Sequence, residues 1–275
     1  MGAAGVGPAG GKVTGDGNAS GRAFEKWEGL GNDFVVVYGD PPPLPAAVCD
    51  RRRGVGADGI LALTGGGDAV WRMLVLNADG SRPEMCGNGL RCVVGSLASR
   101  GSSAWADRGR LNVETDAGLR ACRYQRRQDG TYDVQADMGR ARVGTSFAYE
   151  GISFLPVDVG NPHVVGFVAD GDARLDAVGP ALQTHREGGV NVELCTLRAD
   201  GGIDVVVWER GVGRTRACGT GACAVAAAAV HEGRVPSGAP VGVCLPGGRL
   251  SIEVASDGGV AMTGPARRVF VGRLG

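Results

Sequence analysis

The sequence predicts an α/β (α+β) fold of two similar halves, each a curved, mostly antiparallel sheet around a central helix. Three observations lead to this prediction. Short β-branched runs recur along most of the chain, and many are bounded by Gly, Asp or Asn. Glycine accounts for 50 of the 275 residues, which indicates many tight turns between strands. A Cys-Gly-x-Gly turn that precedes a helical pattern occurs once in each half of the chain.

The first half follows a glycine-rich segment, residues 1–22, which offers little for a core to bury and is predicted to be a disordered tail. A surface helix is expected over residues 43–52. A second helix is expected from Asn88, because the apolar residues between Leu90 and Leu97 fall on one helical face. Strands are expected over residues 34–38, 60–64, 71–77 and 110–115.

The second half repeats this pattern of strands interrupted by two helices. Residues 173–187 are expected to form a surface helix. The helix expected from Thr220 is rich in alanine and apolar on nearly all sides. This composition predicts a buried helix whose small side chains let strands approach closely. Strands are expected over residues 133–138, 152–159, 163–169, 190–197, 203–209, 249–255 and 267–272.

Composition and charge exclude several classes of protein. The 29 Lys and Arg residues balance the 29 Asp and Glu residues, which argues against nucleic-acid binding because phosphates call for a surplus of basic side chains. No apolar run reaches the ~18–20 residues that span a bilayer, and no secretory signal segment is recognised. We therefore expect a cytoplasmic protein with neither nucleic-acid nor membrane partners.

The residue types also limit cofactors and metals. A pyridoxal phosphate Schiff base needs a lysine, and neither Lys12 nor Lys26, the two present, has a supporting motif. The eight cysteines include no C-x-x-C pair, and the three histidines show no ligand spacing. We therefore expect no metal, no cofactor and no disulfide framework.

The two cysteine turns carry the chemical prediction. They read EMCGNGLRCVV (84–94) and RACGTGACAVA (216–226), with a cysteine just before a helix start in each. Unpaired N–H groups and the helix dipole favour a thiolate there, so we expect a lowered pKa for Cys86 and Cys218. The neighbouring glycines let a carboxylate approach those N–H groups. If the halves face each other across a cleft, one cysteine can remove a proton from a carbon atom while the other protonates the opposite face.

The turns belong to a longer, ordered series of motifs. The series is GLGNDF (29–34), RRRGVGADG (51–59), LNADGSRPEMCGNGLRC (76–92), GNPH (160–163), GVNVEL (189–194), ERGVGRTRACGTGA (209–222), LPGGRL (245–250) and MTGPA (262–266). In these motifs, the sequence resembles the diaminopimelate epimerase family from Phe24 to the C-terminus. The resemblance implies two pseudo-symmetric, barrel-like halves with the active site in the cleft between them. It places residues 23–132 and 267–275 in the first half and residues 133–266 in the second.

The resemblance also implies the activity, which is interconversion of LL- and meso-diaminopimelate without a cofactor in lysine and peptidoglycan precursor biosynthesis. Cys86 and Cys218 would be the two catalytic bases, and His163 would have a supporting part. The substrate is a small amino acid, and a homodimer is expected because family members are often dimers. The residues implied to bind substrate are Asn32, Asn77, Gly87, Asn88, Asn161, Asn191, Glu209, Arg210, Gly219 and Thr220.

Three departures from the family pattern bear on the identity of the substrate. Gly59 stands where some members have Gln, Arg214 stands where Glu is frequent, and the segment 185–191 is short. One alternative is therefore an amino-acid racemase of the same fold that acts on another substrate. Proline racemases typically have His where Asn88 stands, which disfavours a substrate of that kind. A thiol-based metal or redox-binding module is the second alternative, and the cysteine spacing argues against it.

Overall fold

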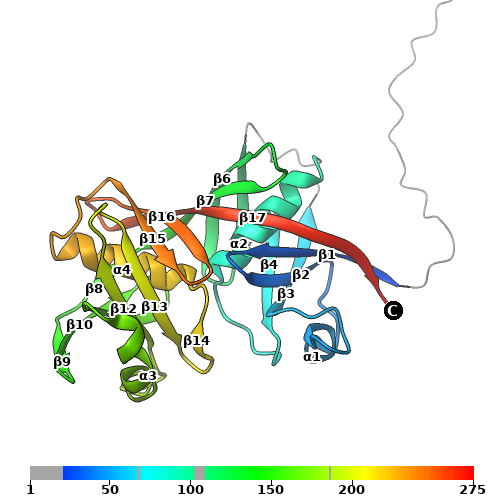
Figure 1. Cartoon of the computed structure of the whole chain (residues 1–275). Helices are drawn as coiled ribbons and strands as arrows, with labels where there is room; N and C mark the ends of the chain where they lie inside the picture. The colour runs from blue at the N-terminus through cyan, green and yellow to red at the C-terminus, as the bar shows by residue number, and fades with distance from the viewer. Residues whose placement is uncertain (1–20, 67–68, 102–108, 186) are drawn as a thin grey trace, which may run out of the picture.

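The computed structural model describes residues 21–66, 69–101, 109–185 and 187–275, which form two halves side by side (Figure 1). The described strands are joined by hydrogen bonds into one sheet of 17 strands. The sheet curls around one long helix in each half, which confirms the predicted fold class. Most of the predicted tail, residues 1–22, lies outside the described ranges, but Arg22 already belongs to the first strand. None of the helices in these ranges is long and apolar enough to cross a membrane.

The first half surrounds helix α2 (Gly87–Ser99). Every residue of this helix from Gly87 to Leu97 is buried, so the sheet and its connections cover more than the single apolar face that the sequence predicts. The short helix α1 (Pro45–Cys49) packs against β3. The strands of this half are β1 (Arg22–Gly29), β2 (Asn32–Tyr38), β3 (Gly59–Gly66), β4 (Ala69–Asn77), β5 (Arg110–Thr115) and β6 (Gly118–Arg126).

The second half surrounds helix α4 (Gly219–His231), which is buried from Gly219 to Ala229 as its alanine-rich sequence predicts. Helix α3 (Gly171–Leu182) packs against β12 and β13 over a separate small core. The main core is continuous and contains apolar side chains of both α2 and α4. The strands are β8 (Arg142–Val143), β9 (Phe147–Tyr149), β10 (Ile152–Asp158), β11 (Pro162–Phe167), β12 (Asn191–Leu197), β13 (Ile203–Glu209), β14 (Gly213–Thr215), β15 (Pro240–Leu245) and β16 (Gly248–Val254).

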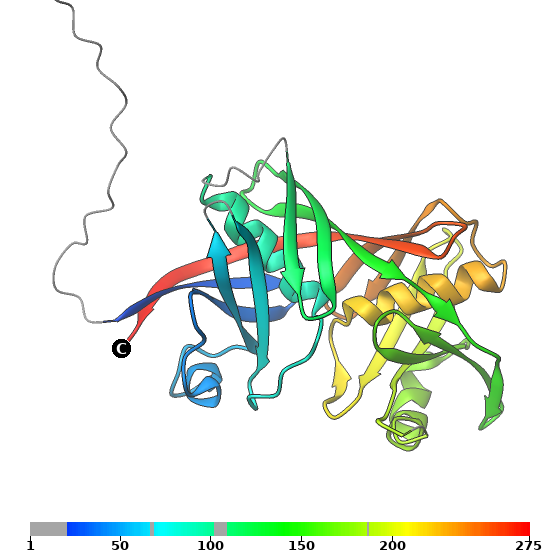
Figure 2. The ribbon, with the colours of Figure 1, turned by 180° about the vertical axis from the view of Figure 1, so that it is seen from behind.

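Two strands, β7 (Tyr132–Arg140) and β17 (Gly259–Leu274), connect the halves. The first part of β17 pairs with β16 and β7, and its last part, from Arg267 to Leu274, pairs with β1. Figure 2 shows this long strand crossing behind both halves, with the C-terminus beside β1. The predicted division of the chain between 132 and 133 stays a prediction, because β7 pairs with β6 as well as with β17.

The structure corrects several details of the predicted elements. Strands β1, β6, β8, β9, β14 and β15 were not expected. In β6 most side chains are polar and only Cys122 is buried, so it has no apolar run to mark it. Helices α1 and α3 are shorter than the predicted ranges 43–52 and 173–187. Strand β17 begins at Gly259 rather than near residue 267, because it continues through Gly264 and Pro265 while pairing with β7.

Candidate active site

The two cysteines that precede the long helices have the same local geometry. Cys86 is the N-cap of α2, and its sulfur accepts a hydrogen bond from the Gly89 N–H at 3.3 Å. Cys218 is the N-cap of α4, and its sulfur accepts one from the Gly221 N–H, also at 3.3 Å. Both backbones are extended at the cysteine, as is usual for an N-cap. Each thiol is therefore held at the positive end of a helix.

The N-termini of the two helices meet at the junction of the halves. A Cβ atom placed on Gly219 would lie 3.5 Å from the Cα atom of Gly87, so the glycines allow this close approach. The side-chain amide of Asn88 donates to the carbonyl oxygen of Ala217 at 3.3 Å. The structure therefore brings together the turns that carry Cys86 and Cys218 from opposite halves of the chain.

Three predicted residues of the first half lie at one end of its sheet. Asn88 donates from Nδ2 to Oδ1 of Asn32 at 3.1 Å, and Asn32 donates to Asp58 at 2.7 Å. Asn77 ends β4, opposite Gly59 in β3, and donates to Ser81 at 2.9 Å. A Cβ atom on Gly59 would lie 2.6 Å from the Leu76 carbonyl oxygen, so this backbone has no room for a Gln side chain.

Ion pairs hold the loop that supports Asn32. Asp33 pairs with the buried Lys26 and with Arg51, both at 2.7 Å, and Arg51 also pairs with Asp58 at 2.6 Å. Burial alone would raise the pKa of Asp33, but the hydrogen bonds from Arg51 and Lys26 lower it to about 2. Lys26 thus serves as a structural cation and is not available as a cofactor-binding amine.

A buried chain of polar groups lies beside Cys218. Thr220 Oγ1 is 3.5 Å from the Cys218 sulfur and accepts from the Asn161 amide at 3.3 Å. His163 bonds Asn161 through Nε2 at 3.0 Å and Glu193 through Nδ1 at 2.7 Å. His163 and Glu193 are fully buried. His163 therefore contacts Asn161 and Glu193, and no hydrogen bond joins it to either cysteine.

The remaining predicted residues come from β12 and the end of β13. Asn191 donates to the Pro162 carbonyl at 3.1 Å and accepts from the Arg210 backbone N–H at 3.0 Å. Glu209 accepts from Thr215 at 2.5 Å. The exposed guanidinium of Arg210 donates to the Gly188 carbonyl in the short 185–191 segment. In this arrangement the Arg210 guanidinium holds that segment.

The pKa values of both thiols differ from the expectation. Burial raises the pKa of Cys86 to about 11, and the charge of Glu209 adds to this. Burial also raises the pKa of Cys218 well above its ordinary value, with further contributions from Glu209 and Glu193. The predicted lowering is wrong for this arrangement, because desolvation outweighs the hydrogen bonds from the helix N-termini. The same Glu209 acts on both thiols, which underlines how close together they lie.

Sequence reasoning missed Glu193, Asp58 and Arg91, all of which contact predicted site residues. Glu193 stands in an otherwise apolar strand, and a lone charge in a buried run was an available signal. Asp58 carried no signal apart from its motif. Arg214, one of the departures from the family pattern, pairs with Asp172 and with Asp176 of α3, so its place is structural.

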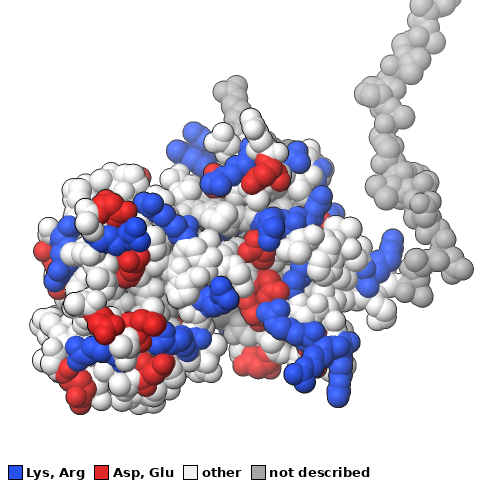
Figure 3. Space-filling model, in the orientation of Figure 1, with Lys and Arg blue, Asp and Glu red and all other residues white. Residues whose placement is uncertain are grey.

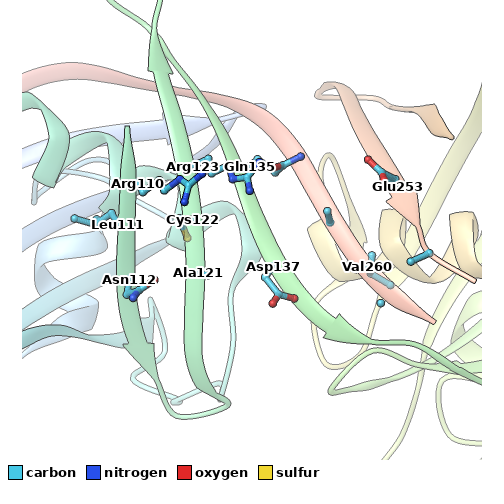
Figure 4. Close-up of a pocket in the computed structure, with 13 residues that line it drawn as sticks. Arg110, Leu111, Asn112, Ala121, Cys122, Arg123, Gln135, Asp137, Glu253 and Val260 are labelled. Atoms are coloured by element: carbon cyan, nitrogen blue, oxygen red, sulfur yellow. The ribbon is translucent and has the colours of Figure 1, made fainter. Parts of the chain in front are cut away.

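The surface also has a cavity that is separate from the predicted site. A cavity of about 680 Å³ lies against β5, β6, β7 and β17 on the face shown in Figure 4. Arg110, Arg123, Asp137 and Glu253 are among its lining residues, and none of the predicted site residues is. Figure 3 shows acidic and basic side chains interspersed on the visible face. Within the described ranges, no group of three or more His, Cys, Asp or Glu side chains could hold a metal ion.

Comparisons with known proteins place these features in a family. The family model described as diaminopimelate epimerase matches residues 24–144 and 155–269. The curated diaminopimelate epimerase of Desulforudis audaxviator (strain MP104C) is 46% identical over 91% of this chain and 98% of its own length. That of Desulfitobacterium hafniense (strain DSM 10664 / DCB-2) is 39% identical over 90% of this chain and 96% of its own.

Solved structures share the fold at low sequence identity. A hydroxyproline epimerase from Agrobacterium vitis superposes with a TM-score of 0.71 at 18% identity, over 92% of this chain and 90% of the other. A phenazine biosynthesis protein of Bacillus anthracis superposes with a TM-score of 0.73 at 15% identity, over 93% and 99%. At these identities the likeness concerns the fold alone.

Proposed function

This chain belongs to the diaminopimelate epimerase family, and from that membership we propose that it interconverts LL- and meso-diaminopimelate with Cys86 and Cys218 as acid and base. One observation carries the proposal beyond the family name. Two cysteines with the same N-cap geometry come from opposite halves, and their turns meet across Gly87 and Gly219. This arrangement suits removal of a proton from one face of a carbon atom and delivery of another to the opposite face.

The proton transfers balance without any redox change. In one direction, the thiolate of one cysteine takes the α-proton and becomes a thiol, leaving a carbanion that its carboxylate stabilises. The thiol of the other cysteine gives its proton to the opposite face and becomes a thiolate. The stereocentre is inverted, and the two sulfurs have exchanged protonation states. The reverse reaction starts from that second state.

The helix N-termini would stabilise the negative charge that develops during this reaction. The backbone N–H groups of Gly87 and Asn88 begin α2, and those of Gly219 and Thr220 begin α4. A carboxylate between them gains from both helix dipoles. The gain grows as the α-proton leaves and charge moves onto the carboxylate oxygens, which lowers the barrier rather than merely tightening binding.

The polar groups around this centre would bind the rest of the substrate. Asn32, Asn77, Asn161 and Asn191 supply neutral donors and acceptors, and Glu209 can accept from an ammonium group. Arg210 offers a fork for a distal carboxylate once it leaves the carbonyl oxygens of the 185–191 segment. These roles follow from the resemblance, and Asn32 and Asn161 also contact the cysteine turns through Asn88 and Thr220.

Entry of the substrate requires the halves to separate. Cys218 is only 5% exposed, and burial raises the pKa of both thiols. In an open cleft water reaches the sulfurs, desolvation is relieved, and a thiolate forms more readily. Closure around the substrate then excludes water and strengthens every electrostatic interaction in the site. A cytoplasmic location, a homodimer and a part in lysine and peptidoglycan precursor biosynthesis belong to this proposal as predictions.

The test is incubation of the purified protein with LL-diaminopimelate in heavy water. We expect formation of the meso epimer with deuterium at the inverted α-carbon, since the proton delivered comes from a thiol in exchange with solvent. Formation of the meso epimer without deuterium would exclude this mechanism. Inversion of proline or hydroxyproline, with no turnover of diaminopimelate, would instead identify a racemase with another substrate.

A further inference from the structure

Arg91, on the first turns of α2, has an unusual environment for an arginine. It is fully buried. Among the described residues no carboxylate lies within ion-pair distance of it, and its hydrogen bonds go to neutral acceptors. These are Asn88 Oδ1 at 2.8 Å, the Pro265 carbonyl oxygen at 3.2 Å and the Met262 sulfur at 3.5 Å. Burial lowers the pKa of its guanidinium below the ordinary value.

The surrounding strands are shaped to admit this side chain. A Cβ atom on Gly29 of β1 would lie 3.1 Å from an Arg91 terminal nitrogen, and one on Gly264 of β17 would lie 3.1 Å from its Nε. Burying a cation without a counter-charge is strongly unfavourable. An apolar side chain of similar volume would avoid this cost, so stability alone does not account for an arginine here.

We infer that Arg91 is a positioning residue for the proposed epimerisation, because its guanidinium fixes the orientation of the Asn88 carboxamide between the two cysteine turns. A guanidinium can only donate hydrogen bonds, so the amide must turn its oxygen toward Arg91. Its Nδ2 group is then directed at Asn32 Oδ1 in the first half and at the Ala217 carbonyl in the second. The inference rests on the proposed function.

The other side of the guanidinium is held by the strand that crosses between the halves. Pro265 and Met262 belong to β17. A Cβ atom on Gly87 would lie 3.0 Å from the Met262 methyl carbon, and one on Gly219 would lie 3.2 Å from the Met262 sulfur. Arg91 thus links the Asn88 amide to Met262, which lies against the first residue of both helices. Its charge also lies behind the place where the proposed carboxylate would bind.

The experiment compares Arg91→Met with Arg91→Lys, and both with a matched control, Arg127→Met. Arg127 pairs with Asp133 in the exposed turn between β6 and β7, far from the cysteine turns. We expect Arg91→Met to lower kcat about 100-fold, with a smaller change in KM, since displacement of reacting groups by about 1 Å costs about that much. Arg91→Lys keeps the charge without the fork and should recover part of the rate, while Arg127→Met should behave like wild type.

A double-mutant cycle distinguishes positioning from a structural role. If Arg91 acts through Asn88, then Arg91→Met should cost much less in an Asn88→Ala background than in the wild type. Additive losses, or a wild-type rate for folded Arg91→Met, would overturn the inference. So would a loss of rate in Arg91→Met that only matches the fraction of unfolded protein in a thermal melt.

A readout that does not need turnover separates this inference from the proposed function. In the nuclear magnetic resonance spectrum, the two side-chain amide hydrogens of Asn88 should be protected from exchange in wild type. They should lose protection in Arg91→Met. Unchanged protection would contradict the inference even if the protein proved inactive on diaminopimelate. Conversely, loss of protection together with an inactive wild type would reject the proposed function and leave the structural link intact.

Discussion

The two cysteine turns have the same backbone geometry but differ in the charged residues that act on each thiol. At Cys86, the charge of Glu209 raises the pKa of the thiol and the charge of the buried Arg91 lowers it. Beside Cys218 lie Glu193 and Glu209, whose charges raise its pKa. Burial dominates at both positions, raising the pKa of Cys86 to about 11 and the pKa of Cys218 well above its ordinary value.

The difference shows how a repeated unit can supply two different groups. A proton transfer through the substrate needs one thiolate and one thiol at the same time. Identical surroundings would leave the two sulfurs equally easy to ionise. Because Arg91 is among the causes acting on Cys86 and Glu193 among those acting on Cys218, we expect Cys86 to ionise more readily than Cys218 once the cleft opens.

The largest expected effect tests whether both turns are needed. Cys86→Ala and Cys218→Ala should each lower epimerisation by about 10³-fold or more, because each removes one of the two proton-transfer groups. The rate is measured by formation of the meso epimer from the LL epimer. Cys244→Ala, on β15 and away from the junction, is the control and should keep the wild-type rate. If Cys86→Ala or Cys218→Ala retained full activity, the substituted cysteine would not take part in the mechanism.

The next effect concerns the stability of the loop that holds Asn32 against the Cys86 turn. In this loop Asp33 pairs with Lys26 and Arg51. The folded pKa of Asp33 is about 2, below its ordinary 3.8, so its contribution is present above about pH 4 and is lost as the pH falls toward 2. Asp33→Asn should lower the free energy of unfolding at neutral pH by about 2 kcal/mol.

Chemical denaturation between pH 7 and pH 2 measures this effect. The variant should lose stability less steeply than wild type below pH 4. Arg214→Met is the matched comparison from the second half, where the ion pairs with Asp172 and Asp176 are exposed. Arg214→Met should lower the free energy of unfolding by less than about 1 kcal/mol. If Asp33→Asn and Arg214→Met lost equal stability, the ion pairs at Asp33 would contribute no more than exposed ion pairs do.

The smallest effect tests the electrostatic difference between the turns directly. Glu193→Gln removes a charge that raises the pKa of Cys218 and that is not among the causes acting on Cys86. We expect alkylation of Cys218 at pH 8 to become several-fold faster, with Cys86 unchanged, as measured by mass spectrometry of the modified peptides. Glu253→Gln, on β16, is the control. A parallel change at both cysteines would contradict the assignment of distinct surroundings.

Much of the fold could be predicted because its signals are local. The apolar runs predict most strands, and the alanine-rich segment after Thr220 predicts the buried helix α4. Strand β6 was missed because its mostly polar side chains look like a loop in sequence. Strand β1 is largely buried, but the charged Glu25 and Lys26 interrupt its apolar residues. Strand β17 was predicted too short, because glycine and proline within it are tolerated only through its pairing with β7.

The candidate site likewise has features that the sequence predicts and features that it does not. The N-cap positions of Cys86 and Cys218 follow from the turn motif, and so does the polarity of the helix ends. The direction of the thiol pKa shifts could not be predicted, because it depends on burial created by the meeting of two distant segments. Arg91 gave no signal of its contact with Asn88 either, since a charged residue on a helix is usually exposed.

The pairing of β1 with the end of β17 has a consequence for the order of folding during translation. β1 leaves the ribosome long before its partner, Arg267 to Leu274, is synthesised. The second half can complete its own sheet as soon as β16 and the start of β17 have emerged. One edge of β1 in the first half must stay unpaired until Arg267 to Leu274 has emerged, and contacts so distant in sequence form slowly. A nascent chain truncated before Arg267 should therefore depend most on chaperones at the edge of its first strand.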